Sequence, residues 1–84
     1  MKNEVWLRCR VSKGMFSDEA VVEVRGREGR ELSFIVPRCD VAFVRDSSGR
    51  VRVTVVERGG ARWAVLPTTY SDSIPVRDED LVQA

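Results

Sequence analysis

Apolar side chains recur at every second position in several short stretches of the chain, and this pattern limits the fold more than any other feature. Between residues 4 and 13, Val5, Leu7, Cys9 and Val11 alternate with polar side chains and a tryptophan. A period of two is typical of a strand with one buried face. Valine, whose branched Cβ suits a pleated sheet, occurs fifteen times against four leucines. The sequence therefore predicts an all-β protein, and the same alternation marks strands at residues 20–25, 32–36 and 51–56.

Glycine, proline and polar residues separate these stretches and predict the turns. Residues 26–29, with a glycine at each end, predict a turn. Residues 46–49 predict a four-residue hairpin loop, and Gly59-Gly60 predicts a two-residue hairpin turn. Residues 77–80 predict one helical or 3₁₀ turn before a brief closing strand. A small sheet that closes on itself avoids exposed edges. We therefore expect residues 1–84 to form a single small barrel of five to seven short antiparallel strands.

Two segments carry a resemblance to a known fold. The closing IPVRDEDLVQ resembles the end of SH3-like barrels, and RVRVTVVERGGARWAVLP is similar to their central β-meander. The resemblance implies an SH3-like barrel with a 3₁₀ turn near the C-terminus, and an OB-like barrel is the alternative. A proline-rich ligand is not implied, because there is no ALYDY-like run and Ala64 follows Trp63. KGMFSDE resembles a segment of a small uncharacterised bacterial protein family, and this resemblance attaches no particular activity to the chain.

The residue types present argue against catalysis. The chain has no histidine, so Ser–His and Cys–His arrangements are impossible. Residues 78–80 are three consecutive acids, whose side chains point in different directions, and we interpret them as a solvated turn. The glycine pairs open no helix and therefore form no phosphate loop. We expect no enzymatic activity, no cofactor, no metal and no small-molecule substrate.

The two cysteines and the hydropathy pattern bear on the compartment. No stretch approaches the roughly 18 apolar residues of a membrane helix, and the first twenty residues lack an apolar signal core. We expect a cytoplasmic protein without membrane contact. Cys9 and Cys39 are expected to be free thiols in the apolar core. A disulfide and a reactive or metal-binding role are the alternatives.

Arginine suggests the first of two binding surfaces. Twelve of the fourteen basic residues are arginine, and residues 41–66 hold five arginines against two acids. Arginines beside an aromatic ring are what single-stranded nucleic-acid barrels use. Alternatively, the arginines form a solvated face paired with Glu23, Glu31 and Glu57. Arg8 and Arg10 share a predicted strand face with Trp6, and a tight hairpin would bring Arg50, Arg52 and Arg62 together.

Large apolar residues suggest the second surface. Met15 and Phe16 lie between turn formers, where they either plug an open barrel end or remain exposed as an anchor for a partner. Trp6 and Tyr70 are expected to be accessible, although the stems of the neighbouring arginines could lie over the ring of Trp6. Trp63 is expected in the core with Ala61 and Val65. From these residues we expect a protein-interaction module that binds a protein partner or self-associates, with single-stranded nucleic-acid binding as the alternative.

Overall fold

Eight antiparallel strands and two 3₁₀ turns make up the computed structural model, which describes residues 4–83. The all-β prediction and the closing 3₁₀ turn are confirmed, but the expected count of five to seven strands is wrong. The count is exceeded because the short segments on either side of the second 3₁₀ turn both pair as strands. The elements are β1 (Val5–Lys13), β2 (Glu19–Arg25), β3 (Glu31–Pro37), η1 (Arg38–Asp40), β4 (Val41–Arg45), β5 (Ser48–Arg58), β6 (Ala61–Val65), β7 (Ser73–Pro75), η2 (Asp78–Asp80) and β8 (Leu81–Gln83).

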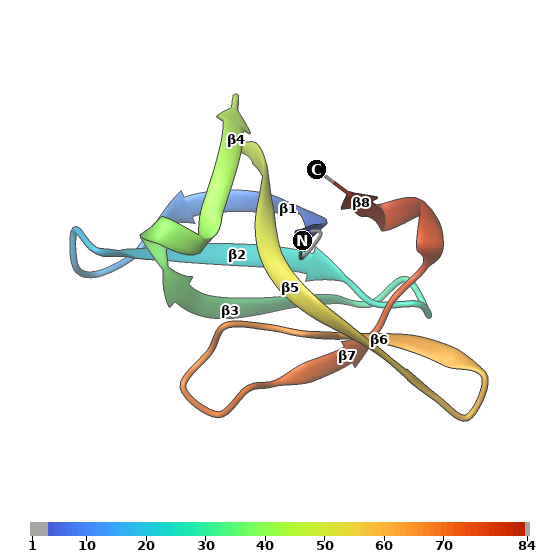
Figure 1. Cartoon of the computed structure of the whole chain (residues 1–84). Helices are drawn as coiled ribbons and strands as arrows, with labels where there is room; N and C mark the ends of the chain where they lie inside the picture. The colour runs from blue at the N-terminus through green and yellow to red at the C-terminus, as the bar shows by residue number, and fades with distance from the viewer. Residues whose placement is uncertain (1–3, 84) are drawn as a thin grey trace.

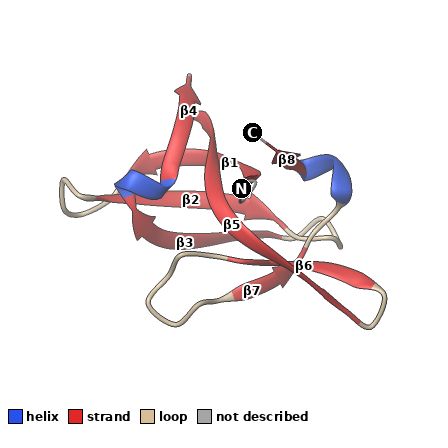
Figure 2. Ribbon diagram, in the orientation of Figure 1, coloured by secondary structure: helices blue, strands red, loops and turns tan. Residues whose placement is uncertain are grey.

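The strands form one sheet in the order β3-β2-β1-β5-β6-β7, with β4 added to β5 and β8 added to β1 (Figure 1). β1 pairs along one edge with β5, and along the other with β2 at one end and β8 at the other. The first half of β5 pairs with β1 on one edge and with β4 on the other, and its second half pairs with β6. Because these two long strands are shared, the sheet curls into a half-barrel, and β4 projects from it together with the start of β5. Figure 2 shows the two 3₁₀ turns, each leading directly into a strand.

The core fills the concave side of this curled sheet. Leu7 is fully buried and lies opposite Val51 on β5 and Leu81 on β8, so one side chain joins three strands. The buried faces predicted for β1 and β2 are confirmed. Burial of these apolar side chains is the main source of stability for a domain of this size. The core cluster consists of Leu7, Cys9, Ala20, Val22, Val24, Val36, Val51, Val53, Ala64, Leu66, Ile74 and Val76.

Two hairpin turns set the registers of β4 to β6. Gly59 and Gly60 have φ of +60° and +80°, and Arg58 pairs with Ala61, so the predicted two-residue turn is confirmed. The four-residue loop predicted at residues 46–49 is wrong, because Arg45 pairs directly with Ser48. The turn is only Asp46-Ser47, and both residues adopt positive φ. Asp tolerates this conformation better than most residues do.

The face expected for β6 is also wrong. Ala64 and Leu66 are buried, whereas Trp63 is half-buried on the opposite face. The register that the Gly59-Gly60 turn imposes places Trp63 opposite Val56, and the guanidinium carbon of Arg58 lies 5.6 Å from its ring centroid. The indole is therefore covered by a long polar side chain rather than by the core.

The two cysteines differ in environment, and both are free. Cys9 is buried in the core, as expected, but Cys39 is exposed in η1, so the prediction of two core thiols is wrong for Cys39. Desolvation raises the pKa of the Cys9 thiol from 9.0 to about 12. The thiolate is the reactive form of cysteine, so Cys9 is inert at neutral pH in the folded protein.

This pKa difference predicts an alkaline loss of stability. The unfolded Cys9 thiol ionises near pH 9 and the folded one near pH 12, so between these values the folded state holds the extra proton. Its contribution to the free energy of unfolding is complete below about pH 9 and then falls by up to about 1.4 kcal/mol per pH unit. Urea unfolding from about pH 8 to about pH 11 measures the slope. Cys9→Ala should show a shallower slope, and equal slopes would contradict the assignment.

Candidate functional site

The register between β1 and β5 gathers arginines on the outside of the sheet. Arg8 lies directly opposite Arg50, and Trp6 lies opposite Arg52. Their sequence neighbours on β1, Leu7 and Cys9, belong to the core, so these four residues occupy the outer face of the β1–β5 ladder. β4 adds two further side chains next to them. We call this surface the arginine face, which consists of Arg8, Arg10, Phe43, Arg45, Arg50 and Arg52 around Trp6.

Arg62 does not belong to this face, contrary to prediction. It lies on β6 opposite Glu57, beside the second half of β5, whereas Arg50 and Arg52 lie in the first half. Its Nε is 3.4 Å from Asp78 Oδ1 and 3.9 Å from Glu57 Oε1. The Gly59-Gly60 turn therefore pairs Arg62 with acids rather than with the other arginines.

Trp6 is buried, so its expected accessibility is wrong. Only 4% of the side chain is exposed, although it lies on the outer face. The ring of Phe43 meets it edge to face, with centroids 5.8 Å apart and planes at 81°. The guanidinium carbon of Arg52 lies 5.1 Å from the indole centroid. Large neighbours on the outer face thus cover Trp6, as stacked arginine stems and aromatic edges commonly do.

The exposed ring of the arginine face is Phe43, which the sequence did not reveal. It is 62% exposed and has φ of +57°, an outlier for a bulky residue. The pairing of β4 with β5 shifts register between Ala42 and Arg45, which turns Phe43 out of the alternating pattern. The guanidinium carbon of Arg50 lies 4.8 Å from its ring centroid. A strand bulge of this kind has no clear signature in VAFVR, so no sequence signal indicated Phe43.

A groove of about 300 Å³ runs along this face. Arg8 and Arg50 line it from β1 and β5, and Phe43 and Arg45 line it from β4. Arginines from three strands therefore surround one ring and one depression. The remaining lining residues are Cys9, Ser48 and Gly49.

Few carboxylates balance these charges. Arg52 has acidic partners, with Glu4 at 3.9 Å and Asp40 at 4.0 Å. Within residues 4–83, no carboxylate lies within 4 Å of the charged groups of the other four arginines, Arg8, Arg10, Arg45 and Arg50. The expected pairing with acids occurs elsewhere, between Arg25 and Glu31 and between Arg62 and Glu57. Arg8 and Arg50 are like charges at directly opposite positions of the ladder, an arrangement that generally destabilises a sheet.

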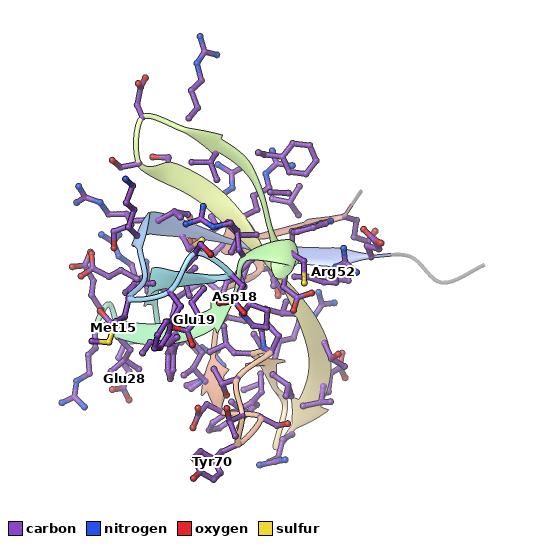
Figure 3. The ribbon with its side chains drawn as sticks, turned by 90° about the vertical axis from the view of Figure 1, so that its left-hand side faces the viewer. Met15, Asp18, Glu19, Glu28, Arg52 and Tyr70 are labelled. Carbon is purple, nitrogen blue, oxygen red and sulfur yellow. The ribbon has the colours of Figure 1, made fainter. Side chains whose placement is uncertain are left out.

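The apolar residues of the second predicted surface are exposed. Met15 and Phe16 are 88% and 62% exposed, so they do not plug the barrel end. Tyr70 is 87% exposed, as expected. In Figure 3, Met15 and Tyr70 lie on separate loops, and both lie away from Arg52. The predicted surface is therefore split between two loops, and Trp6 does not contribute to it.

A groove of about 490 Å³ lies between these two loops. Its lining includes Ile35, which is 58% exposed on β3. β3 pairs only with β2, so its other edge is unpaired within residues 4–83. The alternation that predicts a strand at residues 32–36 did not indicate a groove. The groove is lined by Asp18, Glu19, Ile35, Val36, Pro37, Pro67, Thr68 and Thr69.

The structure contains no further chemical centre in the part that it describes. No three Cys, Asp or Glu side chains among residues 4–83 gather closely enough to hold a metal ion. No helix in that range is both long and apolar enough to cross a membrane. Comparisons of the chain with protein-family models, curated proteins and solved structures found no match.

Proposed function

We propose that the arginine face binds single-stranded nucleic acid. The observation that carries this proposal is that Arg8, Arg45 and Arg50 line one groove with the exposed ring of Phe43, and that Arg10 follows Arg8 on the same face of β1. Among residues 4–83, no carboxylate lies within 4 Å of the charged groups of these four arginines. Barrels that bind single strands combine a positive groove for the backbone with rings on which bases stack. The planar guanidinium also suits phosphate, because it donates two parallel hydrogen bonds.

The repulsion between Arg8 and Arg50 supports an anionic ligand. Opposite like charges cost a sheet a few tenths to about 1 kcal/mol. A phosphate placed between two guanidiniums turns this repulsion into two attractive contacts. The nearby acids Glu4 and Asp40 contact Arg52, at the other end of the ladder from Arg10 and Arg45. The local field over the groove is therefore positive although the whole chain carries only +1.

Single strands fit this face better than duplexes. Phe43 presents a ring at the surface, and a base can stack on it only when the base is free of its own partners. The arginines make contacts with phosphates, which carry no sequence information. We therefore expect weak sequence preference and a preference for unpaired strands.

A salt titration tests the proposal. A labelled oligothymidylate of about twelve nucleotides, within the usual site size, is titrated with the protein, and fluorescence anisotropy reports binding. If four arginines each neutralise one phosphate of a single strand, log K falls with log salt at a slope of about −2.8. A duplex of the same length should compete poorly. Absence of binding at about 50 mM salt, or an affinity that is equal at about 200 mM, would contradict the proposal.

The unpaired edge of β3 favours a second candidate function, self-association. We propose that two copies of the chain join their β3 edges as antiparallel strands, which would cover Ile35 and satisfy the free backbone groups. Sedimentation of the wild type should then show a concentration-dependent dimer. Ser33→Pro, which removes a backbone donor from β3, should shift the protein to monomer. A wild type that stays monomeric at about 100 μM, a concentration that populates even weak dimers, rules out this candidate.

A further inference from the structure

We infer that Trp6 is a second, covered base-binding site, which a nucleotide reaches when the ring of Phe43 swings away. This inference rests on the proposed function of the arginine face. It adds a specific subsite to that face and a movement that opens it. Three observations carry it, and they concern the indole, its cover and the two arginines beside the rings.

The indole of Trp6 is the first observation. The side chain is 4% exposed and lies outside the core cluster, on the opposite face of β1. Its Nε1 has no hydrogen-bond partner among residues 4–83. A buried Trp N–H usually has a partner, and an unsatisfied buried donor costs about 1–3 kcal/mol. A carbonyl oxygen or ring nitrogen of a base would supply the missing acceptor.

The cover is the second observation. Phe43 shields Trp6 but is itself 62% exposed, so moving its ring gives up little of the buried area of Phe43 itself. Its φ of +57° is unfavourable for a bulky side chain. Ala42 pairs with Arg50 and Arg45 pairs with Ser48, but the β4–β5 ladder is interrupted between these two pairs. Phe43 and Val44 can therefore rearrange without breaking a ladder pair. The segment that covers Trp6 is thus weakly held.

The third observation is that each ring has an arginine over it. Arg50 lies over Phe43 at 4.8 Å, and Arg52 lies over Trp6 at 5.1 Å. A phosphate draws a guanidinium away from a ring, because a charge-assisted hydrogen bond is stronger than an exposed cation–π contact. The vacated ring face is then free for a base. The ligand must therefore supply a phosphate and a base together, as a nucleotide within a single strand does.

The emission of Trp6 tests this inference in the Trp63→Phe variant, which leaves Trp6 as the single tryptophan. Two ligands of equal length are compared, an oligothymidylate and a strand of abasic sites that carries only sugar and phosphate. Both should bind by anisotropy, but only the oligothymidylate should quench Trp6 emission, by half or more. If both bind and neither alters Trp6 emission, the inference is wrong and the proposed function stands. If neither binds, both are wrong.

Two further variants separate the cover from the site. Phe43→Gly removes the cover at a position whose φ favours glycine, and acrylamide should then quench Trp6 in the free protein as it quenches an exposed indole. A Trp6 that stays shielded in this variant overturns the role of Phe43.

Trp6→Phe in the wild-type chain keeps a ring but removes the N–H. It should weaken oligothymidylate binding about fivefold, the value of one hydrogen bond, and leave abasic-strand binding unchanged. Equal loss for both strands contradicts a base contact.

Discussion

Replacing Arg8 and Arg50 together by glutamine is expected to lower the affinity for a single-stranded oligonucleotide at least about tenfold at low salt. These two arginines occupy opposite positions of the β1–β5 ladder and line the same groove, so the double variant removes the centre of the arginine face. The slope of log K against log salt should become shallower by about 1.4, since two phosphate contacts are lost. Anisotropy titrations at several salt concentrations measure both quantities.

A matched control removes the same charge elsewhere. Arg25 and Arg30 are exposed around the turn between β2 and β3, away from the β1–β5 ladder. Their double replacement by glutamine should change affinity by less than about threefold and leave the salt slope nearly unaltered. Equal effects of the two double variants would show that only net charge matters, and the arginine face would then have no special role.

The Arg8→Gln single variant also has a predicted effect on stability. It relieves the repulsion from Arg50, so the free energy of unfolding should rise by a few tenths to about 1 kcal/mol. A variant that binds more weakly and yet folds more stably is the behaviour expected of a functional site. Urea unfolding of the free proteins measures the change, and a clear loss of stability would speak against unrelieved repulsion.

Replacing Trp6 by alanine is expected to be the most destabilising change on the outer face. The side chain is 4% exposed, and replacing a buried Phe or Trp by alanine typically costs about 3–5 kcal/mol. A domain of this size has a total stability of roughly 4–12 kcal/mol, so a large part of it would be lost. Chemical denaturation followed by circular dichroism measures the effect.

The other ring of the same aromatic pair provides the contrast. Phe43 is 62% exposed with φ of +57°, so Phe43→Gly loses little burial and relieves an unfavourable backbone conformation. Its free energy of unfolding should stay within about 1 kcal/mol of the wild type. If Phe43→Gly proves as damaging as Trp6→Ala, Phe43 is a structural side chain rather than an accessible ring.

Much of the fold could be predicted because short stretches of the sequence carry clear signals for strands and turns. The period of two in β1 and β2 identified their buried faces, and Gly59-Gly60 identified a turn that requires positive φ at both positions. The closing 3₁₀ turn was predicted from residues 77–80, and the resemblance to SH3-like barrels implied the same turn. The strand count was too low because β7 and β8 have three residues each, and whether such short segments pair as strands depends on distant partners.

The candidate site was only partly predictable, because it depends on contacts between distant strands. Alternation correctly put Arg8 and Arg10 on the outer face with Trp6, but it could not show that Phe43 and Arg52 cover the indole. Phe43 was missed because a register shift within β4 turns it out of the alternating pattern. Arg62 was misplaced because its position depends on which half of β5 pairs with β6. The Gly59-Gly60 turn predicts that β5 and β6 form a hairpin, but it does not show that Arg50 and Arg52 lie outside the paired half.

The most direct test of the central claim, that the arginine face binds single strands, is a ¹H–¹⁵N spectrum of the labelled protein titrated with oligothymidylate. At low salt, the largest shifts should fall on Trp6, Arg8, Arg10, Phe43 and Arg50, and they should reverse as salt is raised. Shifts confined to the loops that carry Phe16 and Tyr70, or to the edge of β3, would contradict the claim. So would a spectrum that does not change at all.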